Sequence, residues 1–106
     1  MPESGDRGGG LHPEAVLERL RTLTGWALDD GTLLKSYAFP DFVTAVRFVD
    51  RLTVVAEAQN HHPVLSVEWG SVTVRLWSHD VRGITTRDFR LAVALDELAA
   101  AGTAKG

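Results

Sequence analysis

The sequence predicts an α+β protein with two layers, in which a four-stranded antiparallel sheet carries three helices on one face. Apolar residues recur at helical spacing in three segments of the chain. Other segments alternate apolar and polar residues as strands do, and short turns join them in pairs. Short turns make each pair antiparallel, so the predicted element order is α-β-β-α-β-β-α.

The first part of the domain is predicted to be a helix followed by a hairpin. Residues 11–25, LHPEAVLERLRTLTG, have apolar positions at helical spacing, and Gly25 is placed as the C-terminal cap. Residues 26–39 are expected to form the hairpin, because Asp30 and Gly31 lie between alternating segments. An Asp-Gly pair in that position is a strong turn signal.

The longest helix is expected over residues 40–60. Its apolar stripe follows three- and four-residue steps and consists of Phe42, Ala45, Val46, Val49, Leu52 and Ala56. Asn60 should end the helix, because asparagine tolerates the left-handed conformation of a C-terminal cap. The residue before a proline is kept out of the helical region, and here that residue is His62.

The remaining chain predicts a second hairpin and a last helix. Residues 64–77, VLSVEWGSVTVRLW, alternate and are expected to turn at Gly70 and the serine after it. The last helix is expected over residues 84–102. Thr85 and Asp88 have the spacing of a capping box at its start, with Asp in place of the usual Glu or Gln.

Composition and charge limit the size and class of the protein. The 106 residues suit one domain, expected over residues 11–101, between a disordered tail at 1–10 and a frayed end at 102–106. The absence of cysteine excludes disulfides, thiolate metal sites and cysteine nucleophiles. A net charge of −3 offers no basic field for nucleic acid, and no apolar run is long enough for a membrane span. Without an apolar signal-peptide core, the sequence predicts a cytoplasmic protein.

The stretch EAQNHHPVLSVEW places two of the four histidines side by side, at the expected end of the long helix. Glu57 and His61 are four residues apart and are expected to meet on one helix face. That carboxylate and the negative helix C-terminus would favour imidazolium at His61, a ready general acid. His62 lies past the helix and can hold a different protonation state. His79 closes a strand, and chain reversal near Gly83 can bring it over the pair.

Other interpretations of these residues stay open on this pattern alone. A histidine near a helix C-terminus is ordinary capping chemistry, and Asp88 suits a cap equally well. Trp69 and Trp77 can stack on a flat heterocycle, although tryptophan is more often a core or interface residue. Three histidines can also hold zinc, but adjacent residues of an extended segment point to opposite sides. We therefore rank acid/base use above metal binding and expect no metal and no cofactor.

One longer pattern runs through the second half of the chain. It consists of Glu57, His61-His62-Pro63, Trp69, His79 and Asp88. The segments FPDFVTAVRFVDRLTVVAE and SHDVRGITTRDFRLA accompany it. This pattern resembles the pterin-4a-carbinolamine dehydratase family over residues 11–98. The chain departs from the family's usual residues at Ser78, in place of threonine, and at Ile84, in place of leucine.

The resemblance implies an enzyme that removes water from a 4a-hydroxytetrahydropterin and gives a quinonoid dihydropterin. The substrate is the spent cofactor of aromatic amino acid hydroxylases. The reaction delivers a proton to the leaving hydroxyl and removes one from the pterin ring, which imidazoles do well near neutral pH. The resemblance assigns proton transfer to His61 and His79, and substrate binding and orientation to His62.

The resemblance also implies supporting residues and partners. Glu57 would tune His61, Asp88 would orient the site, and Trp69 and Ser78 would contact the substrate. Family members form dimers or tetramers, so a homodimer or homotetramer is expected, with an aromatic amino acid hydroxylase as a second candidate partner. The alternative function is that of a non-catalytic partner of a transcription factor or hydroxylase. The intact histidine set weighs against that alternative.

Overall fold

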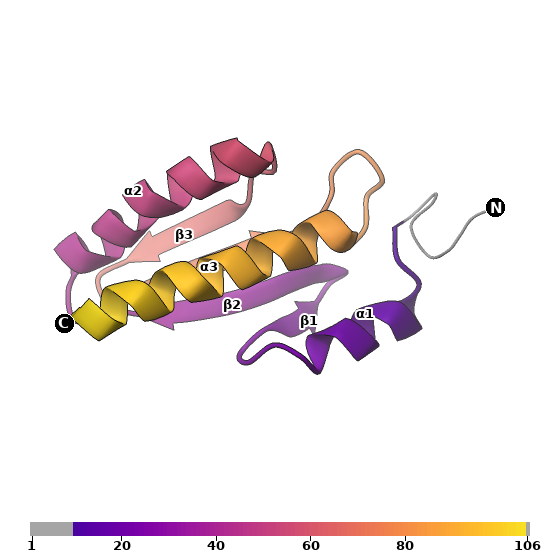
Figure 1. Ribbon diagram of the computed structural model, residues 1–106, viewed down its shortest axis with the longest axis horizontal. Coiled ribbons are helices and arrows are strands. Elements are labelled where there is room, and N and C mark those ends of the chain that lie inside the picture. Colours follow the sequence, from indigo (N-terminus) through magenta and orange to yellow (C-terminus); the bar gives the residue numbers. More distant parts are fainter. Residues whose placement is uncertain (1–9, 106) are drawn as a thin grey trace.

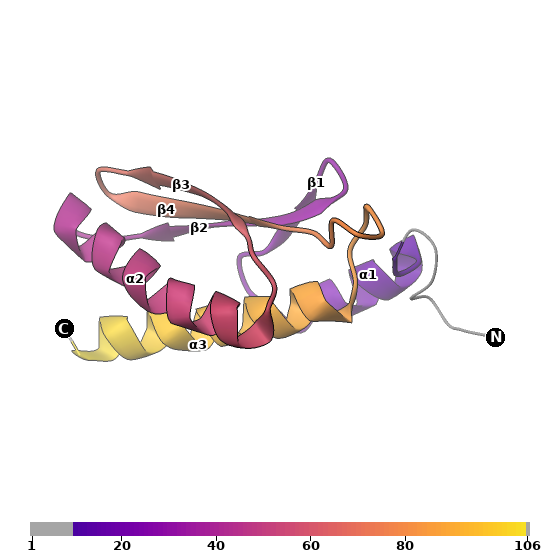
Figure 2. The same ribbon diagram turned by 90° about the horizontal axis from the view of Figure 1, so that it is seen from above.

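The elements of the computed structural model follow the predicted order (Figure 1), and the structure describes residues 10–105. They are α1 (Pro13–Leu20), β1 (Ala27–Asp29), β2 (Thr32–Ala38), α2 (Phe42–Gln59), β3 (Val64–Glu68), β4 (Ser71–Leu76) and α3 (Thr86–Lys105). The strands form one antiparallel sheet in the order β1-β2-β4-β3, and Figure 2 shows all three helices on one side of it. The predicted two-layer α+β fold is confirmed. Of the tail expected over residues 1–10, residues 1–9 lie outside the described residues, and Gly10 is buried. No helix within residues 10–105 is long and apolar enough to cross a membrane.

The two hairpins turn at or near the predicted residues. Asp30 and Gly31 have φ angles of 50° and 74°, and positive φ at both central residues matches the twist of a two-residue hairpin. The second hairpin turns one residue earlier than predicted, because Glu68 already pairs with Ser71. The second strands of the two hairpins, β2 and β4, pair with each other and are therefore the two central strands.

Helix α1 ends earlier than predicted. It stops at Leu20 with Arg21 as its cap, so the prediction of Gly25 as the helix cap is wrong. Gly25 instead lies in the turn before β1 with a φ of 85°. A Cβ at this position would lie 3.0 Å from Cε of Lys35, so both the backbone angle and the passing side chain favour glycine.

Helix α2 begins and ends with local caps. The Asp41 side chain accepts a hydrogen bond from the backbone N–H of Thr44 at 2.8 Å. Asn60 caps the other end in the left-handed conformation, as predicted, with φ 51° and ψ 44°. The buried face differs from the predicted stripe, since Phe42 is 49% exposed and Phe48 is fully buried. The buried face of the helix consists of Ala45, Phe48, Leu52 and Ala56.

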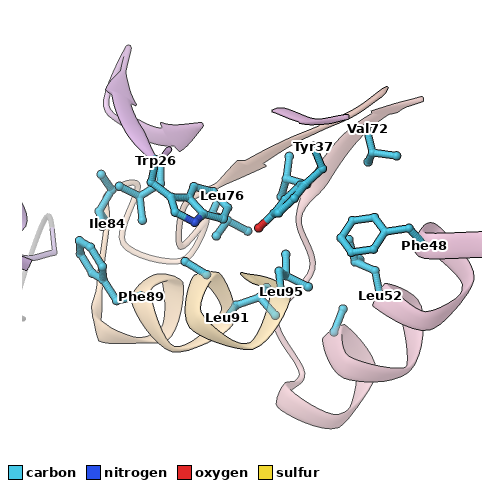
Figure 3. Packing of buried hydrophobic residues seen from close by; sticks show 14 of the residues in the cluster. Trp26, Tyr37, Phe48, Leu52, Val72, Leu76, Ile84, Phe89, Leu91 and Leu95 are labelled. Carbon is cyan, nitrogen blue, oxygen red and sulfur yellow. The ribbon is translucent and has the colours of Figure 1, made fainter. Parts of the chain in front are cut away.

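The core lies between the sheet and the helices, as Figure 3 shows for Leu91 and Leu95 of α3 opposite the strands. Strand β4 contributes three fully buried residues, Val72, Val74 and Leu76. The alternation of buried and less buried residues continues past the end of this strand. Ser78 is therefore fully buried, whereas Trp77 is half-buried and His79 is exposed. This alternation sets which side chains of the segment face the interior.

Candidate active site

An open pocket lies where the end of α2 meets the loop that follows β4. It is lined by Asn60, His61, His62, His79 and Asp80, and its volume is about 250 Å³. The fold thus brings all three candidate histidines to one pocket, although they come from two separate segments of the chain. Asn60 and Asp80 complete its lining. Neither was a candidate site residue, since Asn60 was expected only as a helix cap.

The end of helix α2 separates the two adjacent histidines. The left-handed Asn60 reverses the chain, and the N–H of His61 donates back to the carbonyl oxygen of Ala56 at 3.1 Å. The same carbonyl also accepts a bond from the N–H of Asn60, so both residues are tied to the last turn of the helix. His61 consequently turns inward and is 8% exposed, while the side chain of His62 is 58% exposed.

The inward histidine is held by a buried carboxylate. Nε2 of His61 lies 2.5 Å from Oδ1 of Asp88, which is fully buried. The other oxygen, Oδ2, accepts bonds from the hydroxyl of Ser78 at 3.0 Å and from the N–H of Thr85 at 2.9 Å. The bond from Thr85 confirms the predicted capping spacing at the start of α3. Asp88 therefore joins the start of a helix to the orientation of His61.

Glu57 does not contact the histidine that the sequence assigned to it. Its Oε2 lies 2.7 Å from Nε2 of His62, and the expected pairing with His61 is wrong. The i, i+4 argument assumed that helical geometry continues through His61, whereas Asn60 breaks it. Both partners of the observed pair are exposed, so water screens their attraction and the pair adds little stability.

His79 reaches the pocket from the loop after β4. Its ring stacks on Trp77, with ring centroids 4.1 Å apart and an angle of 14° between the planes. The next residue, Asp80, accepts a hydrogen bond from Nη2 of Arg87 at 2.9 Å. That bond holds the pKa of Asp80 below its usual range, so this rim of the pocket carries a carboxylate at neutral pH. Its place directly after His79 was the only sequence signal for it.

Two residues expected to contact the substrate lie elsewhere. Trp69 follows the end of β3 that is farthest from His62, and it is 72% exposed. A five-residue strand spans roughly 17 Å, which places Trp69 outside this pocket. Ser78 is fully buried, and its hydroxyl bonds to Thr85 and Asp88. Within this chain Ser78 therefore supports Asp88 and does not line the pocket.

Two of the three pocket histidines are bonded to carboxylates. Within the described part of the chain, no three His, Asp or Glu side chains gather as a metal ion would require. Nε2 of His61 is bonded to Asp88, and Nε2 of His62 is bonded to Glu57. Histidine is the residue most often used as a general acid or base, so these pairings make the pocket a candidate site for proton transfer.

Fold and site together define a small two-layer α+β protein with three histidines clustered at one open pocket. Residues 10–98 match the sequence profile of the family described as pterin 4 alpha carbinolamine dehydratase. The chain belongs to this family, whose enzymes are hydro-lyases that act on a pterin.

Individual relatives agree with this membership. The chain is 41% identical over 88 residues to a protein of Roseiflexus sp. (strain RS-1) assigned to these dehydratases, covering 83% of this chain and 95% of that one. It is 42% identical over 95 residues to a Paracidovorax citrulli protein with the same assignment, covering 86% and 82%. The crystal structure of a transcriptional coactivator/pterin dehydratase from Brucella melitensis superposes with a TM-score of 0.81 at 32% identity, covering 85% and 98%.

Proposed function

We propose that this chain dehydrates 4a-hydroxytetrahydropterins by general acid/base catalysis with His61, His62 and His79. The observation that carries the proposal is the convergence of these three side chains on one open pocket. Family membership supports the substrate class and the loss of water as the reaction. The assignment of individual histidines to steps is our inference from their surroundings.

The reaction needs one proton delivered and one proton removed. The C4a–O bond breaks as the hydroxyl takes a proton and leaves as water. A ring N–H gives up its proton, and nitrogen electrons form the new double bond to carbon. No electron leaves the system, so neither an oxidant nor a reductant enters the balance. An acid and a base with ordinary pKa values near neutrality fit this pair of transfers.

The surroundings of the histidines suggest a division of labour. His61 is fixed through Nε2 by Asp88, so its other ring nitrogen is the one that would meet the substrate. His79 lies exposed on the loop side of the pocket, and we assign it the second proton transfer. His62, paired with Glu57 at the surface, would bind and orient the pterin. Glu57 thus takes a role toward His62 in place of the one predicted toward His61.

The test compares wild-type protein with His61→Ala and His79→Ala in an ultraviolet absorbance assay of carbinolamine decay. Each substitution should lower kcat by about 100-fold or more, because general acid/base groups contribute at least that much. His12→Ala is the matched control, since His12 is exposed at the start of α1 and its side chain makes no cap bond. Wild-type protein that fails to exceed spontaneous dehydration would falsify the proposal.

A second candidate function is that of a binding partner. The Brucella protein of similar structure is described as a transcriptional coactivator as well as a pterin dehydratase. Size-exclusion chromatography with a phenylalanine hydroxylase or a candidate transcription factor tests this role, and co-elution of the His61→Ala variant would separate it from catalysis.

We further propose a homodimer or homotetramer. Val64 and Val67 on the edge strand β3 are 46% and 38% exposed, and exposed apolar residues on a strand edge favour association with another chain. Light scattering measures the mass directly.

A cytoplasmic location also stays a prediction from the sequence, and fractionation of the host cell checks it.

A further inference from the structure

The three histidines of the pocket are held by different means. His61 is bonded to Asp88 at 2.5 Å and His62 to Glu57 at 2.7 Å. Within residues 10–105, no side chain or backbone group forms a hydrogen bond with the ring of His79. Its ring contact is with an aromatic neighbour from its own segment. The orientation of His79 therefore depends on packing, whereas the other two histidines are oriented by carboxylates.

That neighbour is Trp77, and the chain places it beside His79 by simple alternation. Residues two apart in an extended segment point to the same side, while Ser78 between them points inward. Ser78 is fixed by its N–H bond to the carbonyl oxygen of Gly83 at 2.8 Å and by its hydroxyl bond to Asp88 at 3.0 Å. The backbone beneath the two rings is thus anchored, and rotation of the His79 side chain is the main freedom left.

The geometry of the pair restricts that rotation. The ring centroids are 4.1 Å apart and the planes differ by 14°, so the indole covers one face of the imidazole. A stacked contact of this kind uses the face of the ring and leaves both ring nitrogens free at its edge. By contrast, the bond to Asp88 occupies one of the two nitrogens of His61. Stacking is the arrangement that orients an imidazole without using either of its proton-carrying atoms.

We propose that Trp77 is a positioning residue of the dehydratase, which holds the plane of His79 so that its nitrogens face the pocket. The inference rests on the proposed function, since it names the residue that prepares His79 for its proton transfer. Without the indole, His79 would sample other rotamers and spend less time aligned with the substrate. An aromatic pair of this kind biases the aligned rotamer by about 2- to 12-fold. This is the expected loss in kcat when the indole is removed.

A purely structural role for Trp77 has to be separated from this one. Trp77 also lines a second pocket of about 370 Å³ on the outer face of the sheet, with Arg75 and Arg82. It does not belong to the buried core, which lies on the opposite face of the sheet. Replacing the indole should therefore leave the folded state intact, and the effect on kcat can be measured on folded protein.

The kinetic test uses Trp77→Leu, which keeps an apolar side chain without a ring, and Trp77→Phe, which restores a ring. Trp77→Leu should lower kcat by about 2- to 12-fold with little change in KM or in the midpoint of thermal unfolding. Trp77→Phe should recover most of the loss. In a His79→Ala background, Trp77→Leu should lower kcat no further, because there is no imidazole left to position. An equal loss in both backgrounds, or no loss in Trp77→Leu alone, overturns the proposal.

A second readout does not depend on catalysis. The indole should shift the ring-proton NMR signals of His79 upfield, and Trp77→Leu should remove that shift while leaving the signals of His12 in place. Unchanged His79 signals would mean that the rings do not stack in solution and would overturn the proposal. If wild-type protein lacks dehydratase activity, the proposed function fails on the kinetic arm, and this measurement still decides whether Trp77 orients His79.

Discussion

Two carboxylates lie about two turns apart on helix α3, and they serve different parts of the molecule. Asp88 at the first turn is fully buried and faces the pocket end of the sheet. It accepts hydrogen bonds from His61, Ser78 and Thr85. None of these donors carries a permanent charge. One of these donors, His61, is also a candidate catalytic residue.

Asp96 is surrounded by a different set of donors. It accepts bonds from Nε1 of Trp26 at 3.1 Å, Nζ of Lys35 at 2.8 Å and the hydroxyl of Tyr37 at 2.6 Å. Burial raises the pKa of Tyr37 above its ordinary value, and its bond to Asp96 raises it further. Strand β2 and the segment before β1 are thereby joined to α3 through one carboxylate that faces an ammonium group.

The two networks differ in the basic side chain that bonds to the carboxylate, which is Lys35 at Asp96 and His61 at Asp88. Asp96 is bonded to Lys35, Trp26 and Tyr37, so its network joins the sheet and the segment before it to α3. The Asp88 network instead contains a histidine, the residue type that enzymes use most often to donate or accept protons. The same residue type on one helix thus joins the layers at Asp96 and, in the proposed mechanism, orients a histidine at Asp88.

The largest effect that would sharpen this comparison is expected from Asp88→Asn. An amide offers one acceptor oxygen where the carboxylate has two, so it cannot serve His61 and the start of α3 as the carboxylate does. We expect kcat to fall by about 100-fold in the absorbance assay. An unchanged kcat would show that His61 needs no carboxylate and would remove the basis for separating the two networks.

A smaller effect, and of another kind, is expected from Asp96→Asn. The variant leaves the ammonium of Lys35 without its counter-charge in a site where that side chain is 18% exposed. We expect the free energy of unfolding to fall by about 2 kcal/mol, measured by urea denaturation. At temperatures where the variant is folded, kcat should match wild type. A fall in kcat as large as that of Asp88→Asn would break the comparison.

The smallest effect concerns alkaline pH and Tyr37→Phe. Because the folded state raises the pKa of this phenol, its contribution to stability is complete below the ordinary value of about 10 and is lost as pH rises beyond it. Wild-type protein should therefore lose stability more steeply above pH ~10 than the variant. At neutral pH the variant should be less stable by about 1 kcal/mol, the usual value of one hydrogen bond. Parallel pH profiles of thermal unfolding for both proteins would contradict this account.

Local chemistry explains what could be predicted from the sequence. Asp30 and Gly31 specify a hairpin turn, Asn60 specifies a helix end, and the Thr85–Asp88 spacing specifies a helix start. Each of these features depends on residues close together in the chain. For the same reason the order of the elements, and the placing of adjacent histidines on different sides of a helix end, followed from the pattern.

The features that sequence reasoning missed depend on distant contacts or on where regular geometry stops. The Asp96 network joins side chains that are 59 to 70 residues apart, and no local pattern reveals it. The error on Glu57 came from extending helical spacing past Asn60 by one residue. The role expected for Trp69 came from the resemblance alone, whereas the strand between His62 and Trp69 keeps the two a strand length apart.

The double attachment of Asp88 has a consequence for how this protein can change over generations. Asp41 caps α2 and has no further duty in the described structure, so Ser, Thr or Asn there would satisfy its only demand. Asp88 must serve a helix start and a histidine together, and asparagine, with its single acceptor oxygen, cannot serve both as the carboxylate does. Substitution at this position is therefore constrained by two contacts, one with the start of α3 and one with the pocket histidine.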